Sequence, residues 1–145
     1  MIGRRMGLPA SELAKIRAAA AIHDVGKLYV PREVLDKPGA LSDEEFALVK
    51  RHSERGAAIV SALGDCDLTS IVRHHHERID GRGYPAGLAG EQIPLGARVV
   101  AVADTFDAIT SPRPYRLAAE HRAALETLRD SAGTQLDPAA VDAFV

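Results

Sequence analysis

Three consecutive histidines and a glutamate, residues 74–77, run directly into a glycine-rich stretch that extends to Pro94. Histidine fills apolar space poorly, and three in a row point in three directions around a helix. Neutral imidazole nitrogens are common ligands for transition metals. The four glycines between positions 81 and 90 would let the backbone approach a bound molecule closely or take positive φ. This stretch therefore predicts a metal site covered by a glycine-rich loop that holds a substrate.

Two other places could contribute to such a site. His23 and Asp24 are adjacent at the end of a predicted helix. Alone, a pair of this kind is more often a simple hydrogen-bonded pair, but it can also supply metal ligands from one turn. Asp104 lies in a strongly apolar helical run, where an unpaired carboxylate would be costly, so we expect it to be paired or bound to metal. Asp107, one turn later, is more often a structural residue than a ligand.

The candidate metal ligands are therefore mixed histidines and carboxylates: His23, Asp24, His52, His75, His76 and Asp104. This mixture suits iron, manganese or zinc, and shared carboxylates suit two or more ions. No cysteine accompanies the set, which argues against a structural zinc site. A metal cluster with open positions can activate water and hold a phosphoryl group. Lys27 and Arg113 could then bind phosphate oxygens, although a solvated surface charge is the default for each alone.

Helices must position these residues, because the hydrophobic pattern is helical almost throughout and no run favours a strand. The predicted fold class is all-α. A connector with room for one helical turn is expected from Pro31 to Leu41. The expected helices run from Pro9 or Ser11 toward His23, from Ser42 to His52, through Ile59 to Leu63, from Asp67 to the histidines, from Leu95 to Ile109, from about Ala119 to Ala132, and from Asp137 onward.

Several residues predict where these helices begin and end. Ser42 and Glu45 form a capping-box pattern, and the helix that they begin should bury Phe46 and Val49. Gly26 is expected to end the first helix. A turn is expected at Gly64–Asp67, with Asp67 as a candidate N-cap of the next helix. Pro112 and Pro114 should end the helix from Leu95, and Gly133 should end the one after it. Asp137 and Pro138 should begin the last helix.

Composition bounds the function classes. The chain has 145 residues with 46% hydrophobic residues, which predicts one domain with a single core. Its formal charge of -2 and few aromatic residues give no reason to expect a nucleic-acid polymer or a membrane as partner. Cys66 is the only cysteine, so no intramolecular disulfide can form, and the default is a cytoplasmic domain. We expect Cys66 itself to be an inert thiol.

Five segments together carry a resemblance to a known family. They are HDVGK at 23–27, HHE at 75–77, DGRGYPAGL at 80–88, IPLGARVVAVADTFDAITSPRPYR at 93–116 and LDP at 136–138. In this order and spacing they resemble the HD-GYP family, a subset of the HD-domain metal-dependent phosphohydrolases. The resemblance implies an HD-domain helical bundle with a GYP loop. It also implies hydrolysis of the bacterial second messenger cyclic di-GMP, to pGpG or on to GMP, with two or three divalent metal ions, often iron or manganese.

Carried onto this sequence, the resemblance assigns roles residue by residue. The implied metal ligands are the six residues named above, with Asp24 bridging metals. Lys27 resembles a lysine that meets a substrate phosphate, and Arg113 resembles the arginine of an RPY motif that does the same. Tyr84 resembles a residue that contacts substrate, and the alternative role for it is loop packing. His74 has no counterpart among the ligands, and we expect His121 to be solvated.

The sequence also departs from the family pattern. That pattern begins with a histidine on a helix well upstream of the HD pair, whereas only 22 residues precede His23 and none is histidine. We therefore expect residues 1–145 to be a single HD-GYP domain that lacks the first helix or helices. Two functions remain open: a cyclic di-GMP phosphodiesterase, or a catalytically impaired module that binds a cyclic dinucleotide or a protein partner. Uncovered apolar surface would invite such a partner or a homodimer. An HD phosphohydrolase acting on other nucleotides is disfavoured by the intact GYP loop.

Overall fold

The computed structural model describes residues 2–111 and 120–145. Over these residues the chain forms nine α-helices, three short 3₁₀ helices and no β-strand, so the all-α prediction is confirmed. The α-helices are α1 (Ile2–Arg5), α2 (Ala10–Ile22), α3 (Arg32–Leu35), α4 (Asp43–Lys50), α5 (His52–Val60), α6 (Cys66–His74), α7 (Leu95–Thr110), α8 (His121–Ser131) and α9 (Pro138–Phe144). The 3₁₀ helices are η1 (Val25–Tyr29), η2 (Ser61–Leu63) and η3 (Gly90–Gln92).

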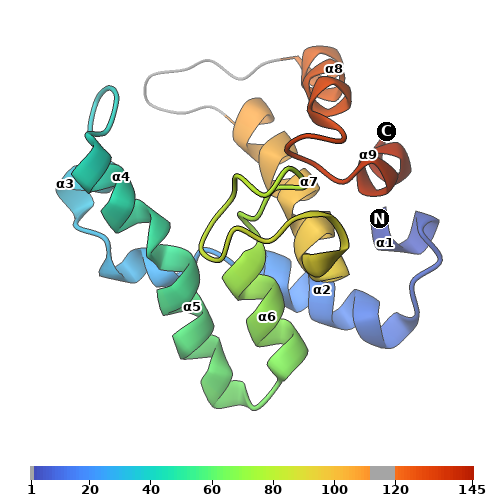
Figure 1. The fold of residues 1–145 in the computed structure, drawn as a ribbon, viewed down its shortest axis with the longest axis horizontal. Coiled ribbons are helices and arrows are strands. Elements are labelled where there is room, and N and C mark those ends of the chain that lie inside the picture. Colours follow the sequence, from blue (N-terminus) through green and yellow to red (C-terminus); the bar gives the residue numbers. More distant parts are fainter. Residues whose placement is uncertain (1, 112–119) are drawn as a thin grey trace.

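Helix α7 runs through the centre of the molecule, with α2 and α6 against one side and α8 and α9 against the other (Figure 1). Its sequence is apolar on most faces, which is what a helix enclosed by neighbours requires. Gly96, in its first turn, lets it come close to α6, because a Cβ there would lie 2.5 Å from Ile71 Cδ1. This central helix carries Asp104 toward the predicted site.

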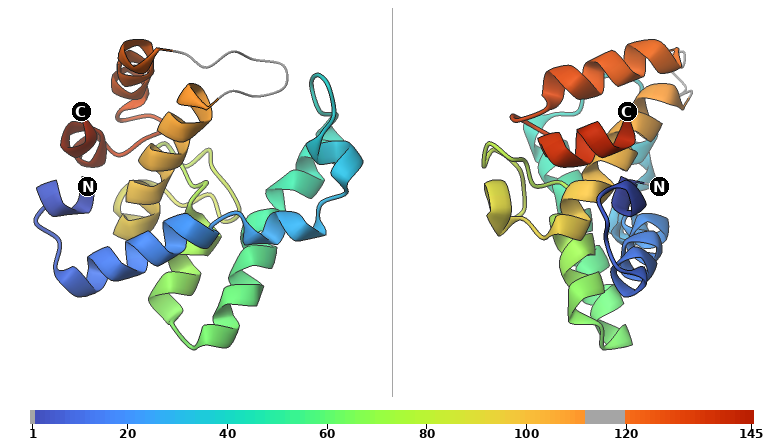
Figure 2. Two further views of the ribbon diagram at one scale, coloured as in Figure 1. Left: turned by 180° about the vertical axis from the view of Figure 1, so that it is seen from behind. Right: turned by 90° about the vertical axis from the view of Figure 1, so that its right-hand side faces the viewer.

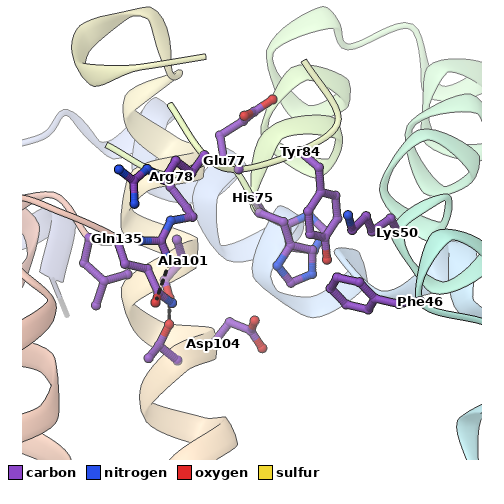
Figure 3. Close-up of a pocket in the computed structure, with 14 residues that line it drawn as sticks. Phe46, Lys50, His75, Glu77, Arg78, Tyr84, Ala101, Asp104 and Gln135 are labelled. Carbon is purple, nitrogen blue, oxygen red and sulfur yellow. Dashed lines mark hydrogen bonds between the residues drawn. The ribbon is translucent and has the colours of Figure 1, made fainter. Parts of the chain in front are cut away.

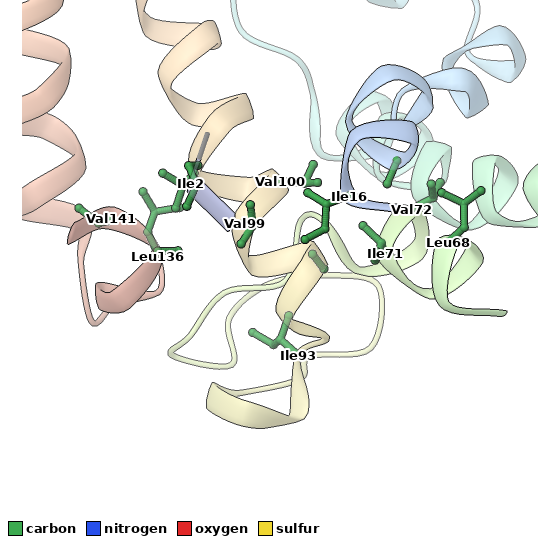
Figure 4. Close-up of a cluster of buried hydrophobic side chains, with 14 of the residues drawn as sticks. Ile2, Ile16, Leu68, Ile71, Val72, Ile93, Val99, Val100, Leu136 and Val141 are labelled. Carbon is green, nitrogen blue, oxygen red and sulfur yellow. The ribbon is translucent and has the colours of Figure 1, made fainter. Parts of the chain in front are cut away.

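One hydrophobic core surrounds α7 (Figure 4). Val99, Val100 and Val102 of α7 are almost fully buried. Ile16 and Ala19 of α2 pack on the same cluster. Other buried members come from α6, α9 and the loops beside them: Leu68, Ile71, Val72, Ile93, Leu136, Ala140 and Val141. The core therefore fixes α2, α6 and α7, three of the elements that carry candidate site residues.

A second contact fixes α5, which packs on α6 and on η1. Gly26 of η1 lies directly against the α5 backbone, since a Cβ at this position would overlap with the carbonyl oxygen of His52. The predicted role of Gly26 as a helix stop is wrong: α2 already ends at Ile22, and Gly26 lies inside a 3₁₀ turn. Its lack of a side chain serves the close approach of two backbone segments instead.

The two ends of the described chain lie side by side in every view (Figures 1 and 2). Helix α1 packs on α9, and the Arg5 guanidinium donates a 3.2 Å hydrogen bond to the carbonyl oxygen of Ala143. Asp137 caps α9 as predicted, accepting hydrogen bonds from the Ala139 and Ala140 amides. Across the two described ranges, none of the helices has both the length and the hydrophobicity that crossing a bilayer requires.

Helix α4 begins as predicted but packs differently. Ser42 Oγ accepts from the Glu45 amide, and the Glu45 carboxylate accepts from the Ser42 amide at 2.7 Å, so the capping box is confirmed. The expected burial of Phe46 is wrong, because its side chain is 45% exposed and α4 contains no buried residue. Val49 is only half-buried. Phe46 instead lines a cavity, together with Lys50 of the same helix.

Other helix ends agree with the sequence to within a few residues. The N-cap of α6 is Asp65, which accepts from the Leu68 amide, and not the predicted Asp67, which pairs with Lys15. Helix α7 ends at Thr110, and Pro112 and Pro114, predicted to stop it, lie outside the described residues. The connector before α4 contains one short helix, α3, as expected.

Candidate metal centre

The HD pair lies where α2 gives way to η1. His23 follows the last residue of α2, and its Nδ1 donates a 2.9 Å hydrogen bond to the carbonyl oxygen of Ala20. A carbonyl oxygen can only accept, so the ring proton of neutral His23 is on Nδ1 and the lone pair is on Nε2. Asp24 then directs one carboxylate oxygen toward His52 and the other toward His23 and Lys27.

His52 and His75 are oriented by the same device. The Nδ1 of His52 donates to the carbonyl oxygen of Val49, and the Nδ1 of His75 donates to that of Val72, each at 2.7 Å. Both rings are fully buried, and their Nε2 atoms lie 3.3 Å apart. With both protons on Nδ1, two lone pairs face each other across this short gap. Such an arrangement is unfavourable unless a cation lies between or beside them.

The remaining candidate ligands close the cluster. One ligand atom each from Asp24, His52, His75 and His76 lies within 4.8 Å of the other three. His23 Nε2 lies 3.5 Å from Asp24 Oδ2 and 3.5 Å from Asp104 Oδ1. All six residues predicted from the sequence are thus brought together from the α2 end, α5, the α6 end and α7.

The electrostatics keep most of the imidazoles neutral. Burial lowers the pKa of His75 to about 4 and lowers the pKa of His52 and His76. His23 differs, because its contact with the Asp104 carboxylate raises its pKa. Neutral imidazole is the form that binds metals.

The carboxylates at the centre are held in the charged form. Burial alone would raise the pKa of Asp24, but the Lys27 ammonium, 2.6 Å away, and the neighbouring histidines lower it below its usual value. Burial would likewise raise the pKa of Asp104, which its contact with His23 lowers. Charged carboxylates beside neutral imidazoles are the donor set of a divalent cation.

Two buried atoms in this cluster have no hydrogen-bond partner: His23 Nε2 and Asp24 Oδ1. A buried polar atom without a partner is costly and usually marks a missing ligand or water. Because both atoms are potential metal ligands and point into the cluster, the residues present fit a divalent metal centre. The prediction that a metal site exists here is therefore supported by the donor set itself.

The GYP loop covers one side of this centre. The Tyr84 ring stacks on the His76 ring, with centroids 4.8 Å apart, and the Tyr84 amide donates to the His76 carbonyl oxygen. Gly83 permits this approach, because a Cβ there would collide with the backbone of residues 76–78. The Tyr84–Pro85 peptide bond is cis. Burial raises the pKa of Tyr84, so its phenol remains a neutral hydrogen-bond donor.

Glu77 holds the GYP loop in place, a role that sequence reasoning missed. Its carboxylate is buried and accepts hydrogen bonds from the Ala86 amide at 2.7 Å and the Leu88 amide at 3.0 Å. It follows two candidate ligands directly in sequence, so it ties the GYP loop to the metal centre. The HHE pattern located Glu77, but only the folded loop shows which amides it meets.

A cavity of about 300 Å³ opens onto His75, His76 and Asp104 (Figure 3). Tyr84, Lys50 and Phe46 form one wall, and Arg78 and Gln135 lie on the opposite side.

The remaining sequence predictions have mixed outcomes. Arg113, predicted to bind phosphate, lies outside the described residues. His74 stays out of the cluster, with its Nδ1 donating to Ser70. Asp107 accepts a hydrogen bond from Ser111 Oγ at the end of α7, which is a structural role as expected.

Fold and site together define a helical protein with a buried histidine–carboxylate centre. The chain matches the HD-domain family over residues 1–140, and it belongs to that family. It is 44% identical, over 100% of its length, to the cyclic di-GMP phosphodiesterase response regulator RpfG of Xanthomonas campestris pv. campestris, and covers 39% of that protein. It is also 44% identical, over 99% of its length, to a cyclic di-GMP phosphodiesterase of Pseudomonas aeruginosa, and covers 35% of it.

A solved structure shows the same fold. A cyclic GMP-AMP-specific phosphodiesterase of Vibrio cholerae superimposes with a TM-score of 0.75 at 20% identity, over 98% of this chain and 39% of that one. The predicted resemblance to the HD-GYP family is confirmed by these relatives. HD-domain phosphohydrolases bind divalent metals, in agreement with the donor set described above.

Proposed function

We propose that this domain hydrolyses a phosphodiester bond of cyclic di-GMP, giving pGpG, GMP or both. The observation that carries the proposal is the convergence of unpartnered imidazole and carboxylate atoms beneath a cavity of about 300 Å³. The relatives named cyclic di-GMP phosphodiesterases support the substrate. The chain spans less than half the length of each of these relatives. Their substrate and activity are therefore a proposal for this domain.

We further propose that the centre takes two or three divalent ions, iron or manganese. Asp24 supports more than one ion because its two oxygens face different groups. Oδ1 faces His52, which clusters with His75 and His76, whereas Oδ2 faces His23, which also contacts Asp104. A carboxylate placed between two ligand groups is suited to be shared by two metals.

Bound metals would polarise the scissile phosphate and lower the pKa of an attacking water. The chain's own residues would do the rest. Lys27, whose ammonium pairs with Asp24, would hold a non-bridging phosphate oxygen. Tyr84, stacked on His76, would donate a hydrogen bond from its phenolic O–H to the substrate. For Arg113, we propose a contact with a substrate phosphate on the basis of the sequence alone. The exposed single cysteine, Cys66, is compatible with the cytoplasmic location that we propose.

The decisive experiment compares Asp24→Ala with Asp36→Ala. Asp24 belongs to the centre, whereas Asp36 forms an exposed ion pair with Arg32. We expect the Asp24 variant to lose cyclic di-GMP hydrolysis by at least about a thousandfold and to lose bound metal, with its helical circular dichroism retained. The Asp36 variant should match the wild-type chain.

The same experiment distinguishes the alternative function. If the wild-type chain binds metal and cyclic di-GMP but does not hydrolyse it under any metal condition, the domain is a binding module and the proposed activity is wrong. Hydrolysis that survives in the Asp24 variant would show that the histidine–carboxylate centre is not the catalytic site.

A further inference from the structure

Helix α4 contributes a wall of the cavity rather than a piece of the core. Phe46 is 45% exposed although the sequence pattern favours its burial. It lines the cavity together with Lys50, one turn later, and with Tyr84 (Figure 3). In this view the three side chains lie on the same side of the cavity, opposite Arg78 and Gln135. An aromatic ring left open at the edge of a substrate cavity is available to a ligand.

Lys50 is a cation placed between two aromatic rings. Its ammonium lies 4.6 Å from the centre of the Phe46 ring and 5.9 Å from that of the Tyr84 ring. Within residues 2–111 and 120–145, no carboxylate lies within ion-pair distance of it. Arg78, another cation that lines the cavity, donates instead to Asp80 and Gln135. Lys50 therefore keeps hydrogen-bond donors free toward the cavity.

A nucleobase fits this combination of a planar apolar face and a cationic edge. Aromatic side chains stack on any base, because each base has a π-face. A lysine ammonium discriminates between purines. It can donate to both O6 and N7 of guanine, whereas adenine presents the donor N6 in place of O6. The Lys50 ammonium lies over one face of the Phe46 ring. A base that stacks on this face would move the flexible lysine side chain aside to the edge of the base, where its ammonium can donate hydrogen bonds.

We propose that Phe46 and Lys50 form a base subsite, in which Phe46 stacks one purine of the cyclic dinucleotide and Lys50 selects guanine over adenine. The subsite extends the proposed function and rests on it for the identity of the ligand. It lies on α4, whereas the candidate ligands come from α2, α5, α6 and α7. Base selection and metal binding are thus carried by different elements.

The subsite is tested by measuring dissociation constants for cyclic di-GMP and cyclic di-AMP by calorimetry. Chelator-treated chain, which cannot use metal for turnover, is compared with manganese-loaded chain. Lys50→Met should weaken cyclic di-GMP about tenfold, or about 1.4 kcal/mol, and leave cyclic di-AMP nearly unchanged. Lys50→Arg should retain the preference for guanine. Phe46→Ala should weaken both ligands about tenfold and leave their ratio unchanged.

Matched controls come from the same fold. Leu48→Ala removes an exposed apolar side chain of α4 that lies away from this cavity, beside Tyr29. Lys15→Met removes an ammonium that pairs with Asp67. Both should bind as the wild-type chain does.

Two results would overturn the subsite. One is a Lys50 variant that weakens both ligands equally, which would assign Lys50 to a phosphate. The other is a wild-type chain that binds both ligands equally or binds neither. Binding with selective loss in the Lys50 variant, but without hydrolysis, would uphold the subsite and refute the proposed activity.

Discussion

Three histidines of the centre are each oriented by the same kind of hydrogen bond. His23, His52 and His75 each donate Nδ1–H to the carbonyl oxygen three residues earlier, which leaves Nε2 facing the cluster. Each backbone carbonyl therefore fixes the ring orientation and the tautomer before any ion binds. The sequence predicts which histidines belong to the site, but a contact between a ring and its own helix end cannot be read from residue spacing alone.

At the same scale, Glu77 gives a testable positioning role. Glu77→Ala removes both acceptors of the Ala86 and Leu88 amides, so we expect faster hydrogen exchange at these two amides by at least about tenfold. The KM of the proposed cyclic di-GMP hydrolysis should rise, because the loop that carries Tyr84 is less ordered, while metal content stays unchanged. Hydrogen-exchange mass spectrometry and metal analysis make the measurement.

The control is Glu91→Ala, an exposed glutamate of η3 in the same loop. This variant should change neither the exchange rates of the Ala86 and Leu88 amides nor the KM. Unaltered exchange in the Glu77 variant would show that the loop is held by its glycines and by its contact with the core instead.

Among elements, the contact between η1 and α5 decides whether His52 reaches Asp24. Gly26→Ala would place a Cβ against the α5 backbone, and a backbone cannot move aside as a side chain can. We expect a loss of about 3 kcal/mol in the free energy of unfolding and a lower metal content, because α5 must move away from the HD pair. Urea denaturation and metal analysis test this.

Gly56→Ala is the matched control at the same contact. A Cβ there would lie 3.3 Å from the Gly26 nitrogen and 3.3 Å from Val72 Cγ1, which small shifts can relieve. Its loss of stability should be clearly smaller. Equal effects of the two variants would mean that the contact is more compliant than its geometry indicates.

The element scale also shows why some predictions failed. Caps depend on a few neighbouring residues, so Ser42 with Glu45 and Asp137 before Pro138 were predictable from the sequence. Phe46 was not, because an apolar face looks the same whether it meets a core or a ligand cavity. Gly26 was misread for a similar reason, since a glycine that ends a helix and one that admits another backbone have the same sequence signature.

Over the whole molecule, the candidate ligands join parts of the chain that are otherwise held mainly by the core. They come from the α2 end, α5, the α6 end and α7. The residue types and their neighbours in the sequence predicted the set, and the resemblance to a family assigned the same six residues, whereas the His23–Asp24 pair alone was ambiguous. What assembles them is packing between elements distant in sequence, such as α2 on α7 and α5 on η1, which no local pattern specifies.

Metal binding should therefore stabilise the entire fold. An ion that binds only the folded state at a hundred times its dissociation constant adds about 2.7 kcal/mol to the free energy of unfolding. For a chain of this size that raises Tm by roughly 10 °C. We expect manganese to raise Tm of chelator-treated protein by this amount and to leave the Asp24→Ala variant nearly unchanged, as measured by scanning calorimetry. A shift of the same size in that variant would place the stabilising ion elsewhere, because Asp24 is the carboxylate that faces both groups of histidines.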